Sequence, residues 1–385
     1  MKTSDLKDQM VDWRQDFHTF PELGFQEQRT SARVAELLSG FGVDVHRNIG
    51  GTGVVGILQR GNGTGSIGLR ADMDALPIVE ANGFAYKSQN HGGMHACGHD
   101  GHTAMLLGAA KYLAEKCAFN GRVVFIFQPN EEHGLGAAAM IKDGLFERFD
   151  VDAVYAMHNM PGMVTGTFAS RTGPMTASES LFEIEITARG GHAALPHMGV
   201  DAIVVGSQIV GALQSIVSRK LNPGINGVVS VTEFITDGKR NVLPGKAVLK
   251  GDARALTPEI NQAIEAHMRQ LVDGICRAHG VSARVSYDTI FPPTLNAQNA
   301  KDAAMGAARM IVDEEAVDGD CEAKLFSEDF ARMAAARPGC FVLTGNGVDG
   351  ANGRALHSAD YDFNNEVLVP GSSFWVALVE QELGE

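Results

Sequence analysis

The order of predicted helices and strands constrains the fold of this 385-residue chain more than any other feature. Up to about residue 177, amphipathic helices alternate with apolar strands, which favours an α/β layer around a largely parallel sheet. Such a sheet carries its chemistry in loops at the carboxyl ends of its strands. The expected helices cover about 5–18, 28–40, 103–116 and 136–145, and the expected strands cover 51–58, 66–72, 122–127 and 152–158.

A different rhythm begins near Ser178 and predicts a second domain. Its order is β-α-β-β-α-β, the ferredoxin-like pattern, after which helix–strand alternation returns. We therefore predict one domain made of 1–177 and 290–385, with a second domain, 178–289, inserted into it. The expected elements are strands at 181–187, 227–234, 246–253, 282–288 and 340–345, and helices at about 200–219, 257–279 and 370–383.

Composition narrows the classes of protein that this chain can represent. Hydrophobic residues make up 44% and charged residues 20%, as in soluble globular proteins, and the net charge of −14 argues against nucleic-acid binding. The five cysteines are irregularly spaced and predict no disulfide framework, which favours a reducing cytoplasm. We find no signal-peptide core and no apolar run of membrane-spanning length, so we expect no membrane association.

Two short motifs indicate a catalytic metal site. HACGHDGH (95–102) places one cysteine and three histidines around an aspartate, and QPNEEHG (128–134) places Glu131 and Glu132 after an apolar strand. A structural zinc site closes four positions with cysteine and histidine, whereas a catalytic site leaves one position for water. A spare glutamate beside such a site is the base that this water needs.

Several candidate ligands lie at or just past predicted strand ends, or in loops. Read singly, Cys97 is equally a small buried hydrophobe, and the histidines are equally ordinary polar residues. The coincidence of Asp72, Glu131, Glu132 and His158 at strand ends favours a metal site. His18, His46, His267 and His279 lie outside any motif and are expected at the surface.

Six segments of the chain resemble those of the M20 metallopeptidase family, in matching order over nearly its whole length. The closest branch contains hippurate hydrolases, N-acyl-amino-acid amidohydrolases and auxin-conjugate hydrolases. The resemblance implies a zinc-peptidase-like α/β catalytic domain with an inserted ferredoxin-like dimerisation or lid domain. The segments are GLRADMDALPI, HACGHDGHTAMLLGAA, FIFQPNEE, GGHAALPH, NVLPG and LHSADYDFNN.

The resemblance also implies residue roles in the catalytic domain. Glu131 is the expected general base, and Asp74 and Asp100 are expected to support the ligands. Related branches have histidine where this chain has Asp72, which leaves the metal role of Asp72 open. Two divalent ions per subunit are expected, of zinc, manganese, cobalt or nickel, and their implied ligands are Cys97, His99, Glu132, His158 and His357.

On the inserted domain, the resemblance implies that His192 stabilises the oxyanion from the partner subunit of a homodimer. Asn241 and Arg254 are expected to hold the substrate carboxylate, although Arg254 is also placed to form an ion pair on the sheet surface. The acidic SEDF segment (327–330) resembles a family motif that lies near the active site, but the sequence assigns it no role.

We therefore predict a metal-dependent amidohydrolase that removes the acyl group from N-acyl-L-amino acids. One alternative is a dipeptidase or carboxypeptidase on the same scaffold. Another is a non-catalytic metal-binding dimer, which would have no use for the second of the two adjacent glutamates. A third, a thiol hydrolase with Cys97 as nucleophile, would survive metal chelation.

Overall fold

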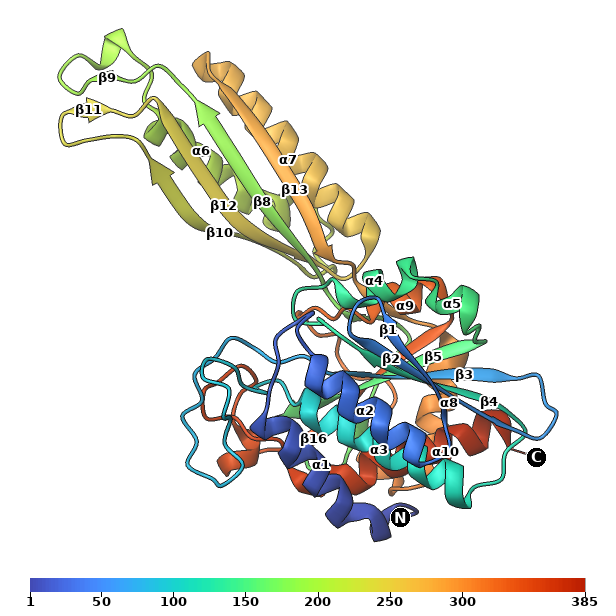
Figure 1. Ribbon diagram of the computed structural model, residues 1–385. Coiled ribbons are helices and arrows are strands. Elements are labelled where there is room, and N and C mark those ends of the chain that lie inside the picture. The colour runs from blue at the N-terminus through green and yellow to red at the C-terminus, as the bar shows by residue number, and fades with distance from the viewer. Residues whose placement is uncertain (385) are drawn as a thin grey trace. The chain divides into compact units, whose positions relative to one another are not determined.

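The chain folds into two compact units. The computed structural model describes residues 1–384. The larger unit combines Met1–Met175, Thr294–Glu322 and the segment that begins at Glu328, and the smaller unit combines Thr176–Pro293 with Ala323–Ser327. The smaller unit is therefore an insertion within the larger one, and the chain returns to it briefly near residue 325 (Figure 1).

Within the described residues, the larger unit is built on a sheet of eight strands in the order β1-β2-β4-β3-β5-β16-β6-β15. The four central strands, β4, β3, β5 and β16, are parallel, whereas β1 and β2 add an antiparallel edge. The strands are β1 (Asp44–Ile49), β2 (Gly53–Arg60), β3 (Ser66–Asp72), β4 (Gly121–Gln128), β5 (Ala153–Pro161), β6 (Phe168–Ala169), β15 (Val317–Asp318) and β16 (Gly339–Gly347); β7 (Gly173–Thr176) and β14 (Thr294–Asn296) form a separate pair.

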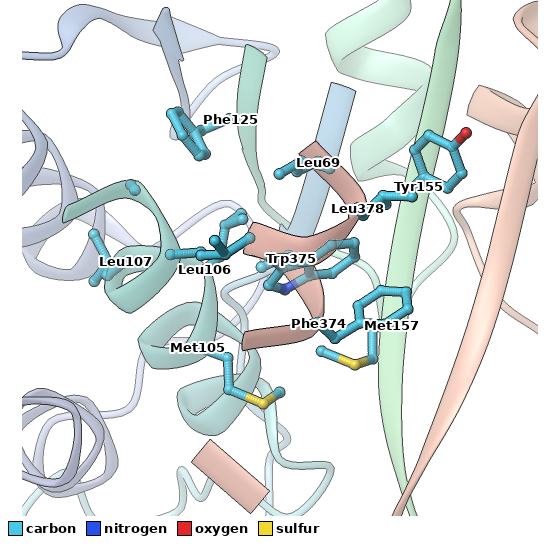
Figure 2. Close-up of a cluster of buried hydrophobic side chains, with 14 of the residues drawn as sticks. Leu69, Met105, Leu106, Leu107, Phe125, Tyr155, Met157, Phe374, Trp375 and Leu378 are labelled. Carbon is cyan, nitrogen blue, oxygen red and sulfur yellow. The ribbon is translucent and has the colours of Figure 1, made fainter. Parts of the chain in front are cut away.

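The helices of this unit cover the sheet and bury its apolar side chains. In Figure 1, the N-terminal helices α1, α2 and α3 lie side by side along the sheet. Figure 2 shows the core around Trp375 of α10, where side chains from β3, β5 and α3 gather. The helices are α1 (Lys7–Thr19), α2 (Gln28–Gly40), α3 (His99–Lys116), α4 (Gly136–Lys142), α5 (Leu145–Arg148), α8 (Gln298–Arg309), α9 (Ala331–Ala336) and α10 (Leu368–Leu383).

The smaller unit is a four-stranded antiparallel sheet in the order β10-β12-β8-β13, with two helices packed on it. The chain order β8-α6-β10-β12-α7-β13 is the ferredoxin-like pattern that the sequence predicts. Its elements are β8 (Ser178–Thr187), α6 (Ala202–Ser215), β10 (Gly227–Thr236), β12 (Lys246–Ala255), α7 (Pro258–His279) and β13 (Ser282–Phe291), with a short ribbon of β9 (Gly191–His192) and β11 (Val242–Leu243).

One helical stretch differs from the sequence expectation about membranes. Ala202–Lys220, which is α6 with its final π-type turn, is long and apolar enough to cross a membrane by length and composition. A single helix of this kind is weak support for a membrane segment, because core helices of soluble proteins pass the same test. One face of this helix, with Val205, Ile209 and Leu213, is buried in the core of the smaller unit.

A buried network of charges fastens α1 to the beginning of α3. Arg14 Nε donates to Asp100 Oδ2 (2.9 Å), and Arg14 also pairs with Asp362. His18, which the sequence places at the surface, is instead fully buried, because its ring bonds Asp100 (2.8 Å) on one side and Glu80 (3.1 Å) on the other. Burial lowers the pKa of His18, but these two carboxylates raise it above its usual value. The imidazole of His18 thus lies between two carboxylates.

We expect Arg14→Met to destabilise the larger unit by about 3–5 kcal/mol, because it leaves buried Asp100 without its strongest partner. Despite burial, Arg14 and His18 hold the pKa of Asp100 well below its ordinary value. The stability from this ion pair is therefore present above about pH 4 and is lost as the pH falls further. Urea unfolding followed by tryptophan fluorescence measures this unit, because Trp13 and Trp375 both belong to it.

The matched control is Arg33→Met, at an exposed arginine of α2 that pairs with Glu36. This change should cost no more than about 1 kcal/mol. Equal losses in the two variants at neutral pH would contradict a stabilising role for the Arg14 network.

Candidate metal centre

The predicted ligands of the HACGHDGH motif lie at the start of α3. Cys97 precedes the helix and His99 is its first residue, with Gly98 between them in the left-handed region (φ 91°). A Cβ at this glycine would lie 2.4 Å from Asn159 Oδ1 and 2.7 Å from the Tyr361 hydroxyl. Only glycine fits here, and this turn aims Cys97 and His99 toward the same place.

The structure brings the five implied ligands together as two overlapping trios. Cys97, His99 and His158 form one trio of donor atoms that all lie within 4.8 Å of one another. Cys97, Glu132 and His357 form the other, by the same measure. Cys97 belongs to both trios, and this set of thiolate, imidazole and carboxylate donors would suit two divalent ions.

The loop that carries His357 is tied to the loop that carries Cys97. The His357 N–H donates to the Ala96 carbonyl (2.8 Å), and His357 itself has a positive φ of 64°. A non-glycine residue rarely adopts this backbone conformation, and such strain concentrates at functional sites. The strain leaves His357 Nε2 3.5 Å from Glu132 Oε2.

Asp74, which is predicted to be a supporting residue, contacts two of the predicted ligands. His99 Nδ1 lies 2.9 Å from the Asp74 carbonyl and 3.2 Å from its Oδ1. The Glu132 N–H donates to Asp74 Oδ2 (3.1 Å). Asp74 thereby fixes the ring orientation of His99 and leaves its Nε2 free to bind, as carboxylates beside ligating histidines do.

The charges and open donor atoms at this site fit a cation. Among the described residues, buried His99 Nε2 and Glu132 Oε1 have no hydrogen-bond partner. Burial lowers the pKa of His99, yet Asp72 and Asp74 raise it to about 10. Burial, followed by the nearby Asp74 and Asp72, raises the pKa of Glu132 to about 7.

Burial and neighbouring charges also shift the pKa of the Cys97 thiol. Burial and then the neighbouring carboxylates Glu132 and Glu131 raise its pKa well above the usual value. Burial lowers the pKa of His158 well below its usual value. Thiol, imidazole and carboxyl groups bind a divalent cation with release of protons, so bound cations would offset the negative charge of this site.

Asp72 is held away from the role that histidine has in related branches. Its Oδ1 bonds His102 Nδ1 (2.7 Å), and its Oδ2 accepts from Arg70 (2.8 Å). His102 in turn bonds Asn159 through Nε2. The donor atoms of Asp72, His99 and His102 also lie within 4.8 Å of one another, but two of these three residues already satisfy each other. We therefore interpret Asp72 as an anchor of the site.

Asp100, expected to support a ligand, instead bonds Arg14 and His18 as described above. His95, also in the motif, is fully buried, and among the described residues neither of its ring nitrogens has a hydrogen-bond partner. Burial lowers the pKa of His95 to about 4, so its ring is neutral. Of the supporting residues, Asp74 alone contacts the predicted ligands in the described chain.

Three further residues that the sequence analysis predicts for the site belong to the smaller unit. His192 is exposed on the β9–β11 ribbon, where it pairs with Val242. Because Asn241 precedes Val242, His192 and Asn241 lie close together. Arg254 lies at the other end of β12, eight residues beyond Lys246 or roughly 26 Å at about 3.3 Å per residue. The guanidinium of Arg254 contacts Asp252, Glu179 and Ser327, each at 2.8 or 2.9 Å.

The sequence analysis missed the buried polar residues behind Glu131. Glu131 Oε1 accepts a hydrogen bond from the Asp329 N–H (3.2 Å), and Arg70 pairs with Glu328 (3.0 Å). Burial, and then Glu328 and Glu132, raise the pKa of Glu131 well above its usual value. The only signal in the sequence was the acidic SEDF segment itself, because Asp329 is 198 residues from Glu131.

Comparison with known proteins agrees with this geometry. The family described as Peptidase family M20/M25/M40 matches residues 68–381. The chain belongs to peptidase family M20. It is 40% identical over 374 residues to the hippurate hydrolase of Campylobacter jejuni, covering 97% of this chain and 96% of that protein. It is 35% identical to thermostable carboxypeptidase 1 of Saccharolobus solfataricus, covering 89% and 86%.

Among solved structures, the M20 family peptidase YXEP of Bacillus subtilis, described as dinuclear metal binding, is similar in fold. The TM-score is 0.85 at 31% identity, covering 97% of this chain and 98% of that one. The chain is therefore an M20 hydrolase that acts on amide bonds, and its donor set supports two divalent ions.

Proposed function

We propose that this M20 hydrolase removes the acyl group from N-acyl-L-amino acids. The observation that carries the proposal is Glu131, a buried carboxylate that the five expected ligands do not include, although its donor atom lies within 4.8 Å of those of His99 and Glu132 and could itself bind metal. A site that only stored metal would need ligands but no such base. The similarity to a hippurate hydrolase supports an acylated amino acid as substrate.

In this proposal, each residue has one task. Two divalent ions, of zinc, manganese, cobalt or nickel, would polarise the amide carbonyl and activate water when bound to the five ligands. Glu131 takes a proton from the attacking water and gives it to the leaving amine. His192 donates to the developing oxyanion, and Asn241 and Arg254 hold the carboxylate of the substrate.

The smaller unit supports a lid role and a homodimer. His192 and Asn241 lie near one end of β12, and Arg254 lies near the other end. One copy of this unit therefore cannot bring all three side chains to one small substrate. We infer that His192 and Asn241 come from the partner subunit. Exposed apolar side chains on α6 and β10, namely Ile203, Val204, Phe234 and Ile235, support association through this unit.

The ion pairs of Arg254 affect this proposal. Its contacts with Asp252 and Glu179 would have to be shared with, or exchanged for, the substrate carboxylate. We also propose a reducing cytoplasm as the location, from the irregular spacing of the five cysteines in the sequence. A dipeptidase or carboxypeptidase is the second candidate, supported by the similarity to a thermostable carboxypeptidase.

Glu131→Gln should lower kcat by roughly 10²–10⁴-fold, because it removes the base and keeps the side-chain shape. Metal content should remain at two ions per subunit, measured by elemental analysis beside the steady-state rates. Asp152→Asn, whose carboxylate accepts the Ser66 N–H at the opposite end of β3, is the matched control and should keep normal rates. Normal turnover by the metal-loaded Glu131→Gln enzyme would exclude this mechanism.

Removal of metal should abolish amine release, and reloading separately with manganese, zinc, cobalt or nickel should restore it. The measurement is amine release from N-acetyl, N-benzoyl and N-indoleacetyl amino acids and from free dipeptides. Release from the acylated set supports a deacylase, and release from dipeptides alone supports the peptidase. Activity that survives chelation but is lost on alkylation would point to the Cys97 thiol hydrolase instead.

Mixing two inactive variants tests whether His192 acts from the partner subunit. His192→Ala and Glu131→Gln should each be inactive, whereas their heterodimer contains one site with both residues intact. After unfolding and refolding of an equal mixture, about a quarter of wild-type activity should return, as random pairing predicts. No recovery, with heterodimers shown by differential tags, would mean that His192 acts within its own chain or not at all.

A further inference from the structure

The acidic SEDF segment is buried, which is costly unless its charges are paired. Glu328 and Asp329 are 1% and 0% exposed. Taking a carboxylate out of water costs several kcal/mol unless a cation or hydrogen bonds compensate it. The contacts of these two residues therefore indicate what the segment does.

One oxygen of the Asp329 carboxylate accepts two hydrogen bonds. Its Oδ2 accepts from the Gln128 side-chain amide (2.8 Å) and from the Ala137 N–H in the first turn of α4 (2.7 Å). The side chain thus fixes the position of the Asp329 backbone. The backbone N–H of the same residue then donates to Glu131 Oε1 (3.2 Å).

Gln128 extends this arrangement into the sheet. It is the last residue of β4 and lies opposite Asp72, the last residue of β3. Its Oε1 accepts from Arg70 Nε (2.8 Å), while the other guanidinium nitrogens of Arg70 pair with Asp72 (2.8 Å) and Glu328 (3.0 Å). The rigid ends of two parallel strands are therefore connected to Asp329 by buried polar contacts.

Glu131 needs this support because it is a side chain with several rotamers in a crowded acidic site. Among the described residues, the Asp329 N–H is the one hydrogen-bond donor directed at its carboxylate. A base must lie within about 0.5 Å of its productive position, and a misplacement of about 1 Å costs on the order of 10²-fold in rate. A donor fixed by the sheet can provide that precision.

We propose that Asp329 and Gln128 are positioning residues for Glu131, acting through the Asp329 backbone N–H. The proposal rests on the proposed role of Glu131 as base. It assigns the SEDF segment to turnover, in addition to its structural contact with α4. The competing interpretation is that Asp329 only stabilises the start of α4, which predicts a loss of stability without a selective loss of kcat.

The first test compares Asp329→Ala with Asp329→Asn in the metal-loaded enzyme. Alanine removes the anchor, so kcat should fall roughly 10–100-fold with KM within about twofold and two ions per subunit retained. Asparagine keeps an oxygen for Gln128 and Ala137, so kcat should return to within about threefold of wild type. The matched control, Asp152→Ala, also removes a carboxylate that accepts a backbone N–H and should leave kcat unchanged.

A second variant addresses the same link from the sheet. Gln128→Met keeps the side-chain length but removes both polar contacts, and it should reproduce the selective loss of kcat. Tryptophan fluorescence verifies that each variant is folded before its rates are compared. Unchanged kcat in folded Asp329→Ala and Gln128→Met, or a loss carried by KM or metal content, would overturn the proposal.

A double-mutant cycle identifies the partner of Asp329. If Asp329 acts through Glu131, adding Asp329→Ala to Glu131→Gln should change the residual rate by less than about twofold. An equal loss in both backgrounds would show that Asp329 acts elsewhere and would refute the inference. Normal turnover by Glu131→Gln alone would instead refute the proposed function, so the two failures are distinguishable.

Discussion

The larger unit buries several acidic side chains at one edge of its sheet, and its stability and its site both depend on the positive charges that compensate them. Asp72, Asp74 and Glu131 lie at the carboxyl ends of parallel strands or just beyond them, where water cannot screen them well. Arg70 compensates Asp72 and Glu328 from inside the sheet. The remaining negative charge faces His99 and Cys97, and this imbalance is what makes the site a cation site.

The parts of this site that the sequence predicts are those carried by local pattern. His158 lies in the carboxyl-terminal half of β5, and Glu132 follows β4. The carboxyl ends of neighbouring parallel strands meet at one edge of a sheet whatever the loops do. The ferredoxin-like order was readable because its strands alternate and its two helices are long. Asp74 was predicted as a supporting residue because a ligating histidine usually has an orienting carboxylate.

The parts that the sequence did not predict depend on contacts between distant residues. Arg14 and Asp100 are 86 residues apart, and no local pattern shows that an arginine of one amphipathic helix will enter the core. His18 was expected at the surface for the same reason. Strand β1 was missed because most of its side chains are exposed or half-buried, as an antiparallel edge allows, so it lacks the apolar signal of a central strand. Helix α8 was not predicted individually, and its buried face is formed largely by small alanine side chains.

The position of β16 has a consequence for how the chain is made. This strand pairs with β5 in the middle of the sheet, yet it follows β5 by the whole of the inserted unit. During synthesis, residues 176–293 emerge before β16. At that stage the smaller unit lacks only its short segment Ala323–Ser327, whereas β5 of the larger sheet still lacks its partner strand β16. Open strand edges invite pairing with other chains. Until about residue 347 leaves the ribosome, the unpaired edge of β5 is therefore exposed to pairing with other chains. This is the interval in which binding by a chaperone would protect the nascent chain most.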